Sequence, residues 1–429
     1  MASKLKFQAI KGTRDLLPPD TELWNRVEQT AREVFATYGF GEIRPPIFEP
    51  TELFARAVGG ETDIVSKEMY SFEDRDETSV SLRPEATASV CRAYIEHNMQ
   101  QLPAPVKLYY LGPMFRRERP QKGRYRQFYQ IGAEVLGGTD APGIDAEVIE
   151  MVMSFFARLG LEGVQLEINS IGHSAPECRR GYVEKLRAAL EKVKDQLGED
   201  SRRRIDTNAL RVLDSKLESE QAIIAKLPRI GDHLCDECAK HYAEVKRQLQ
   251  LRGVAFSENW RLVRGLDYYM RTAFEITAKG LGSQNAVCGG GRYDGLVELL
   301  GGPPTKGIGF AIGEDRLILA LQEAGKVSVA RGRDVYIAWM GEKALPIAIA
   351  AAQKLRNAGL RVELPPTEQK FGKALGQADK LGSLYALILG EDEVATGQWT
   401  LKTLADGSQQ KYTEPELLAF LDKNRTLSS

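Results

Sequence analysis

The sequence predicts an α+β protein: a sheet with flanking helices and a helical insertion, followed by a separate C-terminal α/β domain. Two strand patterns joined by a basic loop lie between residues 109 and 134. Strand signals nearly vanish from about residue 176 to residue 253, and strands alternate with helices from residue 335 onward. A length of 429 residues, at roughly 150 residues per domain, leaves room for two or three domains.

Composition and charge limit the classes of function. The chain is 43% hydrophobic and 27% charged, with a formal net charge of −1, which is typical of a soluble globular protein. Nucleic-acid binding would therefore have to come from local basic patches. No apolar run approaches the ~20 residues of a membrane span, and the first six residues lack the apolar core of a secretory signal. Five scattered cysteines favour reduced thiols, so we expect a cytoplasmic protein.

The N-terminal region begins with a helix predicted over residues 22–37, with Gly39 just past its end. Residues 42–48 hold two prolines and should be extended, at a sheet edge or in a self-complementary dimer contact. The region continues with a short helix over 51–58, a strand over 69–72, and a strand over 80–87 that leads into another helix.

The central feature is a strand–loop–strand pattern. The first strand ends near Phe115, and the loop from Arg116 to Arg126 holds six Lys or Arg residues and one Glu. The returning strand places Gln130 and Glu134 on one face at a period of two. An isolated basic loop is usually a solvated hairpin tip, and the alternative is a grip for a polyanion above the sheet.

The remaining elements follow in order. We expect a helix over 145–159, a strand over 164–169, the helical insertion over about 174–254, strands over 259–263 and 272–277, and a glycine-dense passage over 288–295. Residues 305–313 lead into a helix with Arg316 in its first turn. In the C-terminal part we expect strands over 335–339, 361–364 and 385–389, helices over 344–357, 373–381 and 414–424, and a hairpin near Trp399, with a largely parallel sheet.

Several polar residues are candidates for ligand binding. Arg116, Arg264 and Arg316 are suitable counter-charges for a triphosphate, because guanidinium groups pair with phosphate oxygens. Arg316 opposes the dipole of its helix and therefore requires an anion nearby. A small polar pocket could form from Glu85, Gln130, Glu134, Tyr268 and Tyr269, although Glu85 could instead be an N-terminal helix charge. The glycines at 289–291 would let a strand approach a flat ligand. The chain has neither a P-loop nor a dinucleotide fingerprint.

Metal-ligand spacing occurs once, as His233-x-Cys235-x2-Cys238-x2-His241. The four residues are crowded into one helix-rich segment, and the sequence offers no second pair of Cys or His ligands. We therefore expect no metal site from the protein alone. His173 is isolated in the sequence, and we expect it at the surface or at a helix end.

Six stretches resemble the histidyl-tRNA synthetases, a branch of the class II aminoacyl-tRNA synthetases, over essentially the whole chain. Arg-Gly-Leu-Asp-Tyr-Tyr at 264–269 and Gly-Gly-Arg-Tyr-Asp-Gly at 290–295 are specific to this branch. The basic hairpin resembles motif 2 of the class, and the helix of Arg316 resembles motif 3. The matching stretches are residues 11–15, 82–87, 112–134, 262–269, 289–295 and 307–316.

The resemblance implies an antiparallel catalytic sheet, a homodimer formed partly through residues 22–48, and a two-step reaction. ATP with Mg²⁺ and L-histidine would give histidyl-adenylate and pyrophosphate, and the 3′ end of histidine tRNA would then take the histidyl group. The implied domains are a catalytic domain over 1–325, whose insertion over about 174–254 grips the acceptor stem, a linker over 326–333 and an anticodon-binding domain over 334–429.

The resemblance also implies roles for single residues. Arg264 would be the catalytic cation near the α-phosphate, in place of one metal ion, and Arg116 would bind the α-phosphate and the substrate carboxylate. The residues implied in histidine binding are Glu85, Ala86, Thr87, Arg116, Gln130, Glu134, Arg264, Tyr268, Tyr269 and Tyr293. Those implied in ATP binding are Arg116, Glu118, Arg124, Phe128 and Arg316.

Two departures and two rival interpretations accompany the resemblance. Ala86 stands where glycine is common, and Glu314-Asp315 precedes Arg316 where an apolar residue and then Glu are expected. One rival is the histidine-binding regulatory subunit of ATP phosphoribosyltransferase, which we expect to lack the C-terminal domain and parts of motif 2. The other is a tRNA-binding scaffold with an inactive site. The chain retains Arg116, Arg264 and Glu134, which favours the enzyme.

Overall fold

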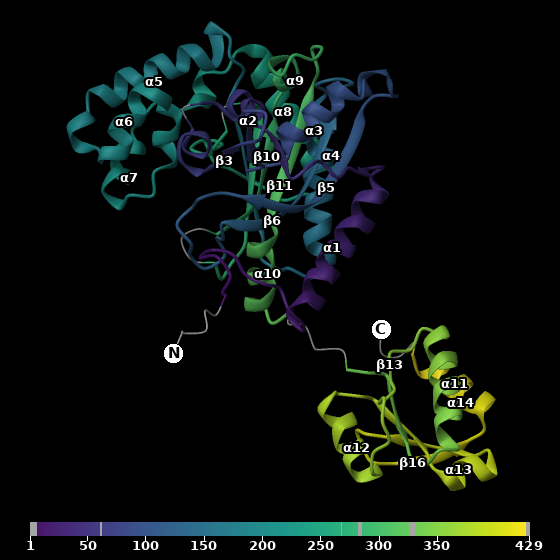
Figure 1. Ribbon diagram of the computed structural model, residues 1–429. Helices are drawn as coiled ribbons and strands as arrows, with labels where there is room; N and C mark the ends of the chain where they lie inside the picture. Colours follow the sequence, from purple (N-terminus) through teal and green to yellow (C-terminus); the bar gives the residue numbers. More distant parts are fainter. Residues whose placement is uncertain (1–6, 61, 267, 282–284, 327–331, 426–429) are drawn as a thin grey trace, which may run out of the picture. The chain divides into compact units, whose positions relative to one another are not determined.

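The computed structural model describes residues 7–425 except 61, 267, 282–284 and 327–331. The chain divides into two compact units, residues 1–327 and residues 328–429, each of which has its own sheet (Figure 1). Most of the predicted linker and Asp267 lie outside the described residues. No described helix is both long and apolar enough to cross a membrane.

The first unit is built on an eight-stranded sheet with the strand order β1-β5-β6-β11-β10-β9-β7-β8. Only the two edge pairs, β1 with β5 and β7 with β8, are parallel, and the other neighbours are antiparallel, as predicted. The strands are β1 (Gly41–Glu42), β5 (Val106–Phe115), β6 (Gln127–Leu136), β7 (Gln165–Ser170), β8 (Ser257–Glu258), β9 (Met270–Thr277), β10 (Ala286–Arg292) and β11 (Gly307–Gly313).

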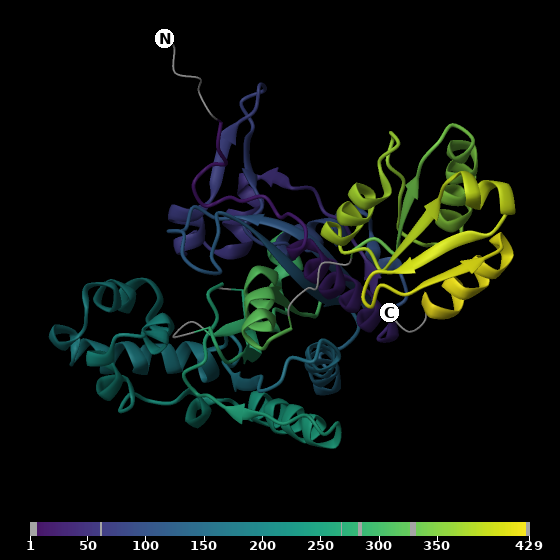
Figure 2. The same ribbon diagram turned by 90° about the horizontal axis from the view of Figure 1, so that it is seen from below.

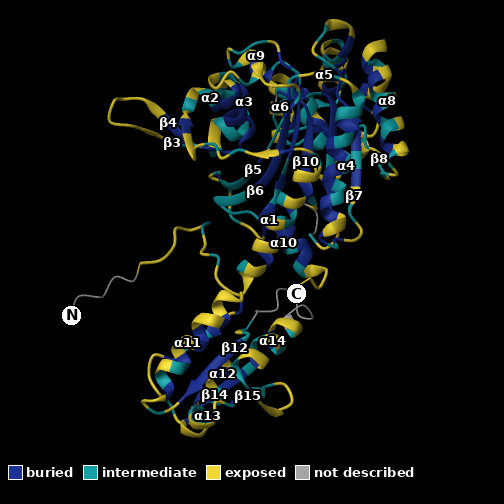
Figure 3. Ribbon diagram, turned by 90° about the vertical axis from the view of Figure 1, so that its right-hand side faces the viewer, coloured by how far each residue is buried: buried dark blue, intermediate teal, exposed yellow. Residues whose placement is uncertain are grey.

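One face of this sheet packs against helices and forms the larger core. Ile131, Ala133 and Val135 of β6 point into that core, so Gln130 and Glu134, which alternate with them, face the other side. Figure 3 shows the central strands and much of α4 as buried. The covering helices are α1 (Asp20–Thr37), α4 (Pro142–Arg158), α8 (Asp236–Leu251) and α10 (Glu314–Glu323).

A smaller three-stranded sheet, with the order β2-β4-β3, lies beside helices α2 and α3. Its hairpin β3–β4 projects from the unit and is largely exposed (Figure 3). The prediction of a strand over 80–87 holds only for its first residues, because α3 begins at Thr87. These elements are β2 (Phe48–Pro50), α2 (Thr51–Val58), η1 (Ile64–Glu68), β3 (Tyr70–Glu73), β4 (Ser79–Leu82), α3 (Thr87–Glu96) and η2 (Met99–Gln101).

The helical segment follows β7, and its teal helices α5–α7 form a group at one side of the unit in Figures 1 and 2. Helix α8 returns to the main core, where Val245 and Leu249 are buried. The elements before α8 are η3 (Pro176–Arg180), α5 (Gly181–Glu191), η4 (Lys194–Gln196), α6 (Glu199–Asn208), η5 (Ala209–Asp214), α7 (Glu218–Ile224) and η6 (Ile230–His233).

The strand predicted over 259–263 is wrong. The Asn169 side-chain amide donates to the carbonyls of Trp260 and Leu262, at 3.3 and 2.9 Å, and Leu262 N donates to Asn259 O. These bonds hold the segment in a turn, and the only strand there is β8, which ends at Glu258.

The second unit has a five-stranded sheet with the order β13-β12-β14-β15-β16. Strand β12 is parallel to β13 and β14, whereas β15 and β16 are antiparallel, so the sheet is mixed rather than largely parallel. Helices α11 and α14 share one core with the sheet, and α12 packs in the other. The elements of this unit are β12 (Val335–Trp339), α11 (Ala344–Asn357), β13 (Val362–Glu363), α12 (Phe371–Lys380), β14 (Tyr385–Leu389), α13 (Glu391–Thr396), β15 (Trp399–Thr403), β16 (Gln409–Tyr412) and α14 (Glu414–Arg425). The short helix α9 (Leu296–Leu299) belongs to the first unit.

Candidate active site

A cavity of about 210 Å³ lies on the polar face of the large sheet, where the basic hairpin bends back over β6, β10 and β11. The five residues predicted to bind ATP all line it. Four arginines reach its wall from separate parts of the chain: Arg116 and Arg124 from the hairpin, Arg264 from the turn before β9, and Arg316 from α10. The other two residues predicted to bind ATP, Glu118 and Phe128, also line the cavity.

The hairpin arginines are fixed by contacts with Glu118 of their own loop and, for Arg116, with Pro84 and Phe128. Arg116 Nε donates to the carbonyl of Pro84 at 2.9 Å, and its guanidinium lies over the Phe128 ring at 5.3 Å from the centroid. Glu118 lies between two of the cations, 3.8 Å from Arg116 Nη1 and 3.1 Å from Arg124 Nη1. These contacts orient both guanidinium groups, and they neutralise only part of the charge.

Arg316 makes no ion pair with any residue that the structure describes. Burial, together with the neighbouring Arg124, lowers its pKa below the ordinary arginine value. The adjacent Asp315 does not compensate, because it pairs with Arg14 at 2.7 Å and accepts from the Tyr129 amide at 2.8 Å. The cavity therefore keeps uncompensated positive charge, which a polyanionic ligand would stabilise.

Arg264 lies between the cavity and the interior of the sheet. Its Nη1 donates to Glu275 at 3.2 Å, and its guanidinium is 5.6 Å from the centroid of Tyr269. A Cβ atom at position 289 would lie 2.0 Å from Arg264 Nη2, so a larger residue there would displace the guanidinium group. We predicted that the glycines at 289–291 would let a strand approach a flat ligand. At Gly289 the group that lies against the strand is the guanidinium of Arg264.

Beside the cavity lies a buried pocket centred on Glu134. Thr87 Oγ1 donates to Glu134 at 2.7 Å, and the Tyr293 hydroxyl donates to its other oxygen. Gly309 lies opposite Glu134 in the ladder, and a Cβ there would be 1.7 Å from Glu134 Oε2. Burial raises the pKa of Glu134 to about 8, well above the ordinary value of a carboxyl group.

Two tyrosines close the pocket. The rings of Tyr268 and Tyr269 are 4.6 Å apart, and Tyr268 meets Tyr293 edge-on at 5.7 Å. Burial raises the pKa of Tyr269 to about 12, so its hydroxyl keeps its proton.

Three buried polar atoms around this pocket lack a partner among the described residues, namely Gln130 Oε1, Tyr110 Oη and Arg264 Nε. An unpaired buried polar atom costs about 1–3 kcal/mol. Their position indicates that a polar ligand completes the site.

The strand-to-helix junction at residues 85–87 has the geometry of a helix cap. Glu85 accepts from the amides of Thr87 at 2.7 Å and Ala88 at 3.0 Å, so the helix-charge interpretation describes these contacts. Burial nevertheless raises its pKa, and the carboxylate stays on the pocket side, beside Glu134. Ala86 is fully buried with φ −112°, a conformation that any L-residue adopts, so alanine fits in place of glycine.

Sequence reasoning missed a buried ionic network next to this pocket. Arg292 pairs with Asp145 and Asp294, and Asp294 in turn accepts from the amide of Gly307 at 3.0 Å. The network fixes β10 and β11 on either side of Tyr293. The Arg-Tyr-Asp triplet in the glycine passage was the available signal, because it places two charges around a buried tyrosine.

A second cavity, of about 380 Å³, shares Arg116 with the first. Its other cations are Lys67 and, from the helical segment, Arg203, Arg204 and Arg211. Two carboxylates, Asp63 and Glu68, also line the cavity, and Asp63 lies 3.5 Å from Arg204 and 3.9 Å from Arg203. A second cavity with more basic than acidic residues thus lies beside the arginine-lined cavity.

Comparison with known proteins agrees with this geometry. The profile of the family described as histidyl-tRNA synthetase matches residues 12–317, which contain every predicted site residue. The chain belongs to the histidyl-tRNA synthetase family.

Two curated relatives and one solved structure illustrate the similarity within the family. The histidine–tRNA ligases of Solibacter usitatus and Koribacter versatilis are each 53% identical to this chain. Each match spans 97% of this chain, and it spans 99% of the Solibacter protein and 96% of the Koribacter protein. The crystal structure of apo histidyl-tRNA synthetase from S. aureus superposes with a TM-score of 0.81 at 37% identity, and it covers 97% of this chain and 100% of its own. A profile described as an anticodon binding domain matches residues 334–424.

Proposed function

We propose that the chain is a histidine–tRNA ligase that activates L-histidine with ATP and then transfers the histidyl group to the 3′ end of histidine tRNA. The observation that carries this proposal is the position of Arg264. Its guanidinium lines the arginine-rich cavity and also lies over Tyr269 of the buried pocket. A phosphate held in the cavity and an amino acid held in the pocket would therefore meet at one cation.

The excess positive charge of the cavity supports its role as the ATP site. Arg316, which has no carboxylate partner among the described residues, would face the γ-phosphate, and Arg116 would bind the α-phosphate. Glu118 and Arg124 would work near adenine and the γ-phosphate. Phe128, already under the Arg116 guanidinium, would present an apolar surface to the nucleotide.

The pocket around Glu134 suits histidine, whose imidazole has two distinct nitrogens. Glu134 would accept from one nitrogen and the Tyr269 hydroxyl would contact the other, while Tyr268 and Tyr293 shape the pocket. The α-amino end of histidine would lie at Glu85, Thr87 and Gln130, with Ala86 as the backbone between them. An apolar amino acid would leave these buried groups unpaired, so the site should reject it strongly.

In the first step a carboxylate oxygen of histidine attacks the α-phosphorus of ATP. A new P–O bond forms, the bond to the β-phosphate oxygen breaks, and pyrophosphate leaves with the electron pair. Negative charge increases on the α-phosphate oxygens in the transition state, and Arg264 is the fixed cation that stabilises it. In the second step a ribose hydroxyl of the tRNA attacks the carbonyl carbon, and AMP leaves.

Mg²⁺ is the metal expected with ATP, and it would supply charge neutralisation at the phosphates. Mg²⁺ in such sites is held by substrate phosphates and one or two carboxylates. The carboxylates on the cavity wall are Glu118, Glu275 and Asp315. Each of these carboxylates already contacts an arginine. Glu275 contacts Arg264 with one oxygen and would offer the other to the metal, whereas both oxygens of Asp315 are taken, by Arg14 and by the Tyr129 amide.

We further propose that the second cavity receives the acceptor end of the tRNA, because it joins the ATP cavity at Arg116 and is lined by cations of the helical segment. In this proposal residues 1–325 form the catalytic domain, with its insertion over about 174–254, and residues 334–429 read the anticodon. Lys122, which is exposed and pairs with Glu323 at 2.9 Å, remains a candidate tRNA contact.

A homodimer is also part of the proposal. Ile47 and Phe48, where the edge strand β2 begins, are 44% and 57% exposed, and a second copy would cover them. We propose a cytoplasmic location as well, which agrees with the free cysteines of the chain.

Histidine-dependent ATP–pyrophosphate exchange tests the proposed activity. With each of the twenty amino acids supplied in turn, we expect exchange with histidine alone. The rival function, a regulatory protein that binds histidine without activating it, predicts histidine binding by calorimetry with no exchange. That result in well-folded protein would reject the enzyme proposal.

A further inference from the structure

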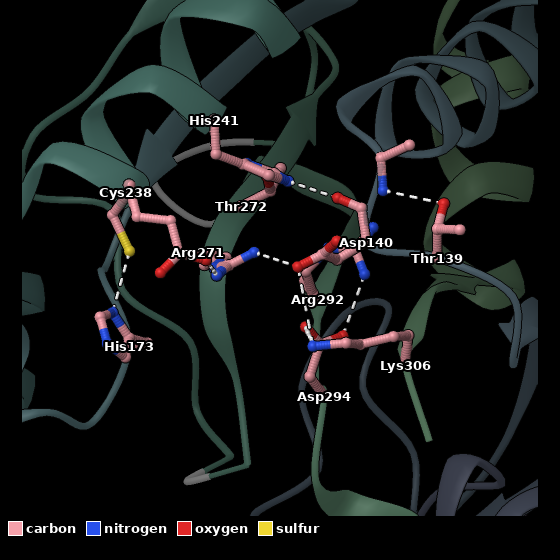
Figure 4. A network of polar contacts seen from close by, with 12 residues as sticks. Thr139, Asp140, His173, Cys238, His241, Arg271, Thr272, Arg292, Asp294 and Lys306 are labelled. Carbon is pink, nitrogen blue, oxygen red and sulfur yellow. Dashed lines mark hydrogen bonds and ion pairs between the residues drawn. The ribbon is translucent and has the colours of Figure 1, made fainter. Parts of the chain in front are cut away.

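Four potential metal ligands from two separate segments converge outside the proposed active site. His173 and Cys178 lie between β7 and the end of η3, and Cys235 and Cys238 lie at the start of α8. One ligand atom of each residue lies within 4.8 Å of the other three. His173 Nδ1 is 3.1 Å from the sulfur of Cys238 and 3.7 Å from that of Cys235, and Figure 4 shows the His173 ring facing Cys238.

These separations are close to those in a tetrahedral zinc site, and small side-chain shifts would bring the four atoms to one ion. Zn–S bonds of about 2.3 Å and a Zn–N bond of about 2.0 Å put the ligand atoms roughly 3.5–3.8 Å apart. Three cysteines and one histidine are also an established ligand set for structural zinc. We propose that His173, Cys178, Cys235 and Cys238 bind one zinc ion.

Burial and electrostatics favour a closed structural site over a catalytic one. Cys178 and Cys238 are 1% and 0% exposed, His173 and Cys235 are half-buried, and four protein ligands would fill a tetrahedral zinc shell. Zinc requires thiolates, and Cys235 is the N-cap of the 16-residue helix α8, whose dipole stabilises negative charge. The Arg271 guanidinium lies on the same side, paired with Asp140 at 2.7 Å and with Glu237, which is the neighbour of Cys238.

The ligands do not follow the histidine spacing seen in the sequence. His241 Nε2 contacts the carbonyl of Asp140 at 3.1 Å, and His233 lies 3.3 Å from Lys185 and against the Tyr182 ring. The prediction that His173 is isolated is therefore wrong, because the fold brings it to the cysteine pair. The missing pair was His173 and Cys178, some sixty residues earlier in the chain.

The location gives the metal a role in the fold. The chain enters the helical segment at Cys178 and leaves it at Cys235, so a shared ion would join both ends of that segment. Arg179, next to Cys178, donates to the carbonyl of Tyr269, and Arg271 N donates to the carbonyl of Gly172 at 2.8 Å. The ion would thus hold the helical segment on the backbone that carries Tyr268 and Tyr269.

Metal analysis of the full chain, purified with reductant and without an affinity tag that binds metal, tests the proposal. We expect about one zinc per chain and, by zinc X-ray absorption, three sulfur ligands and one nitrogen ligand. The variants His173→Ala and Cys178→Ser should lose more than about nine-tenths of the zinc. The matched controls His233→Ala and Cys91→Ser, at a histidine beside the cysteine pair and a buried cysteine outside the cluster, should keep it.

X-ray absorption on the wild-type chain needs no variant, so the proposal stays testable if a ligand variant fails to fold. Three results would overturn it. The first is folded wild-type protein that holds no zinc and takes up none when titrated with Zn²⁺ under reduction. The second is a disulfide among the three cysteines in that reduced protein. The third is loss of zinc from His233→Ala with zinc retained by His173→Ala.

Discussion

Replacing Arg264 with alanine separates transition-state stabilisation from substrate binding. The Arg264 side chain is only 18% exposed, so its charge acts through a medium of effective dielectric constant about 20 rather than through bulk water. A unit charge about 4 Å away is then stabilised by roughly 4 kcal/mol, which corresponds to about 10³-fold in rate. Since Glu275 already takes part of this charge at 3.2 Å, we expect a loss of about 10²–10³-fold.

The assay is single-turnover formation of histidyl-adenylate, with histidine affinity measured separately by calorimetry. We expect the adenylation rate to fall by that factor, while the Kd for histidine changes by about tenfold or less, because the charge on the α-phosphate appears mainly in the transition state. The surface variant Arg247→Ala, which removes an arginine that is 59% exposed, should leave both values unchanged.

A second effect of the substitution needs its own control. Removing Arg264 leaves the partly buried Glu275 without its cation, and the unpaired carboxylate would disturb the site by itself. The double variant Arg264→Ala/Glu275→Gln removes that charge, and we expect it to remain as slow as the single variant. Recovery of the rate in the double variant, or a large loss of histidine affinity at an unchanged rate, would refute the role of Arg264.

Three further predictions concern pH, assembly and tRNA. The pKa of Glu134 is about 8 in the folded chain and 4.5 in the unfolded chain, so its contribution to stability is full below pH 4.5 and is lost, by about 5 kcal/mol, as pH rises through 8. The Tm of Glu134→Gln should therefore depend less on pH than that of the wild type, and parallel plots of Tm against pH would contradict this. Phe48→Asp should dissociate the proposed dimer in analytical ultracentrifugation, whereas Leu251→Asp, also at an exposed apolar residue, should not. Arg204→Ala should weaken tRNA binding and reduce the slope of log K against log salt by about 1, and an unchanged slope would remove Arg204 from the tRNA surface.

Much of the fold could be predicted because local periodicity and turn residues determine it. The helices over 51–58 and 344–357 and the strand over 385–389 occur where we predicted them. The alternation in β6 correctly separated Glu134 from the core residues beside it, since a strand has only two faces. The turn at 259–263 could not be predicted, because the amide of Asn169, some ninety residues away, holds it.

The same distinction applies to the sites. The opposition of Arg316 to its helix dipole correctly indicated an uncompensated charge, because the first turn of a helix is a local feature. The contact of Arg264 with Tyr269 and Glu275 depends on how strands pair, and Glu275 gave no signal of its own. The meeting of His173 and Cys178 with the cysteine pair depends on the path of the helical segment, which sequence spacing does not contain.

The most direct test of the proposed function is aminoacylation of an unmodified histidine tRNA transcript by the full chain with ATP, Mg²⁺ and radiolabelled histidine. If the arginine-lined cavity and the Glu134 pocket form one active site, histidine should accumulate on the 3′ end of the tRNA, and Arg264→Ala should slow this in proportion to its slower adenylation. Histidine binding by folded protein without charged tRNA, under conditions in which a known histidyl-tRNA synthetase charges the same transcript, would contradict the proposal.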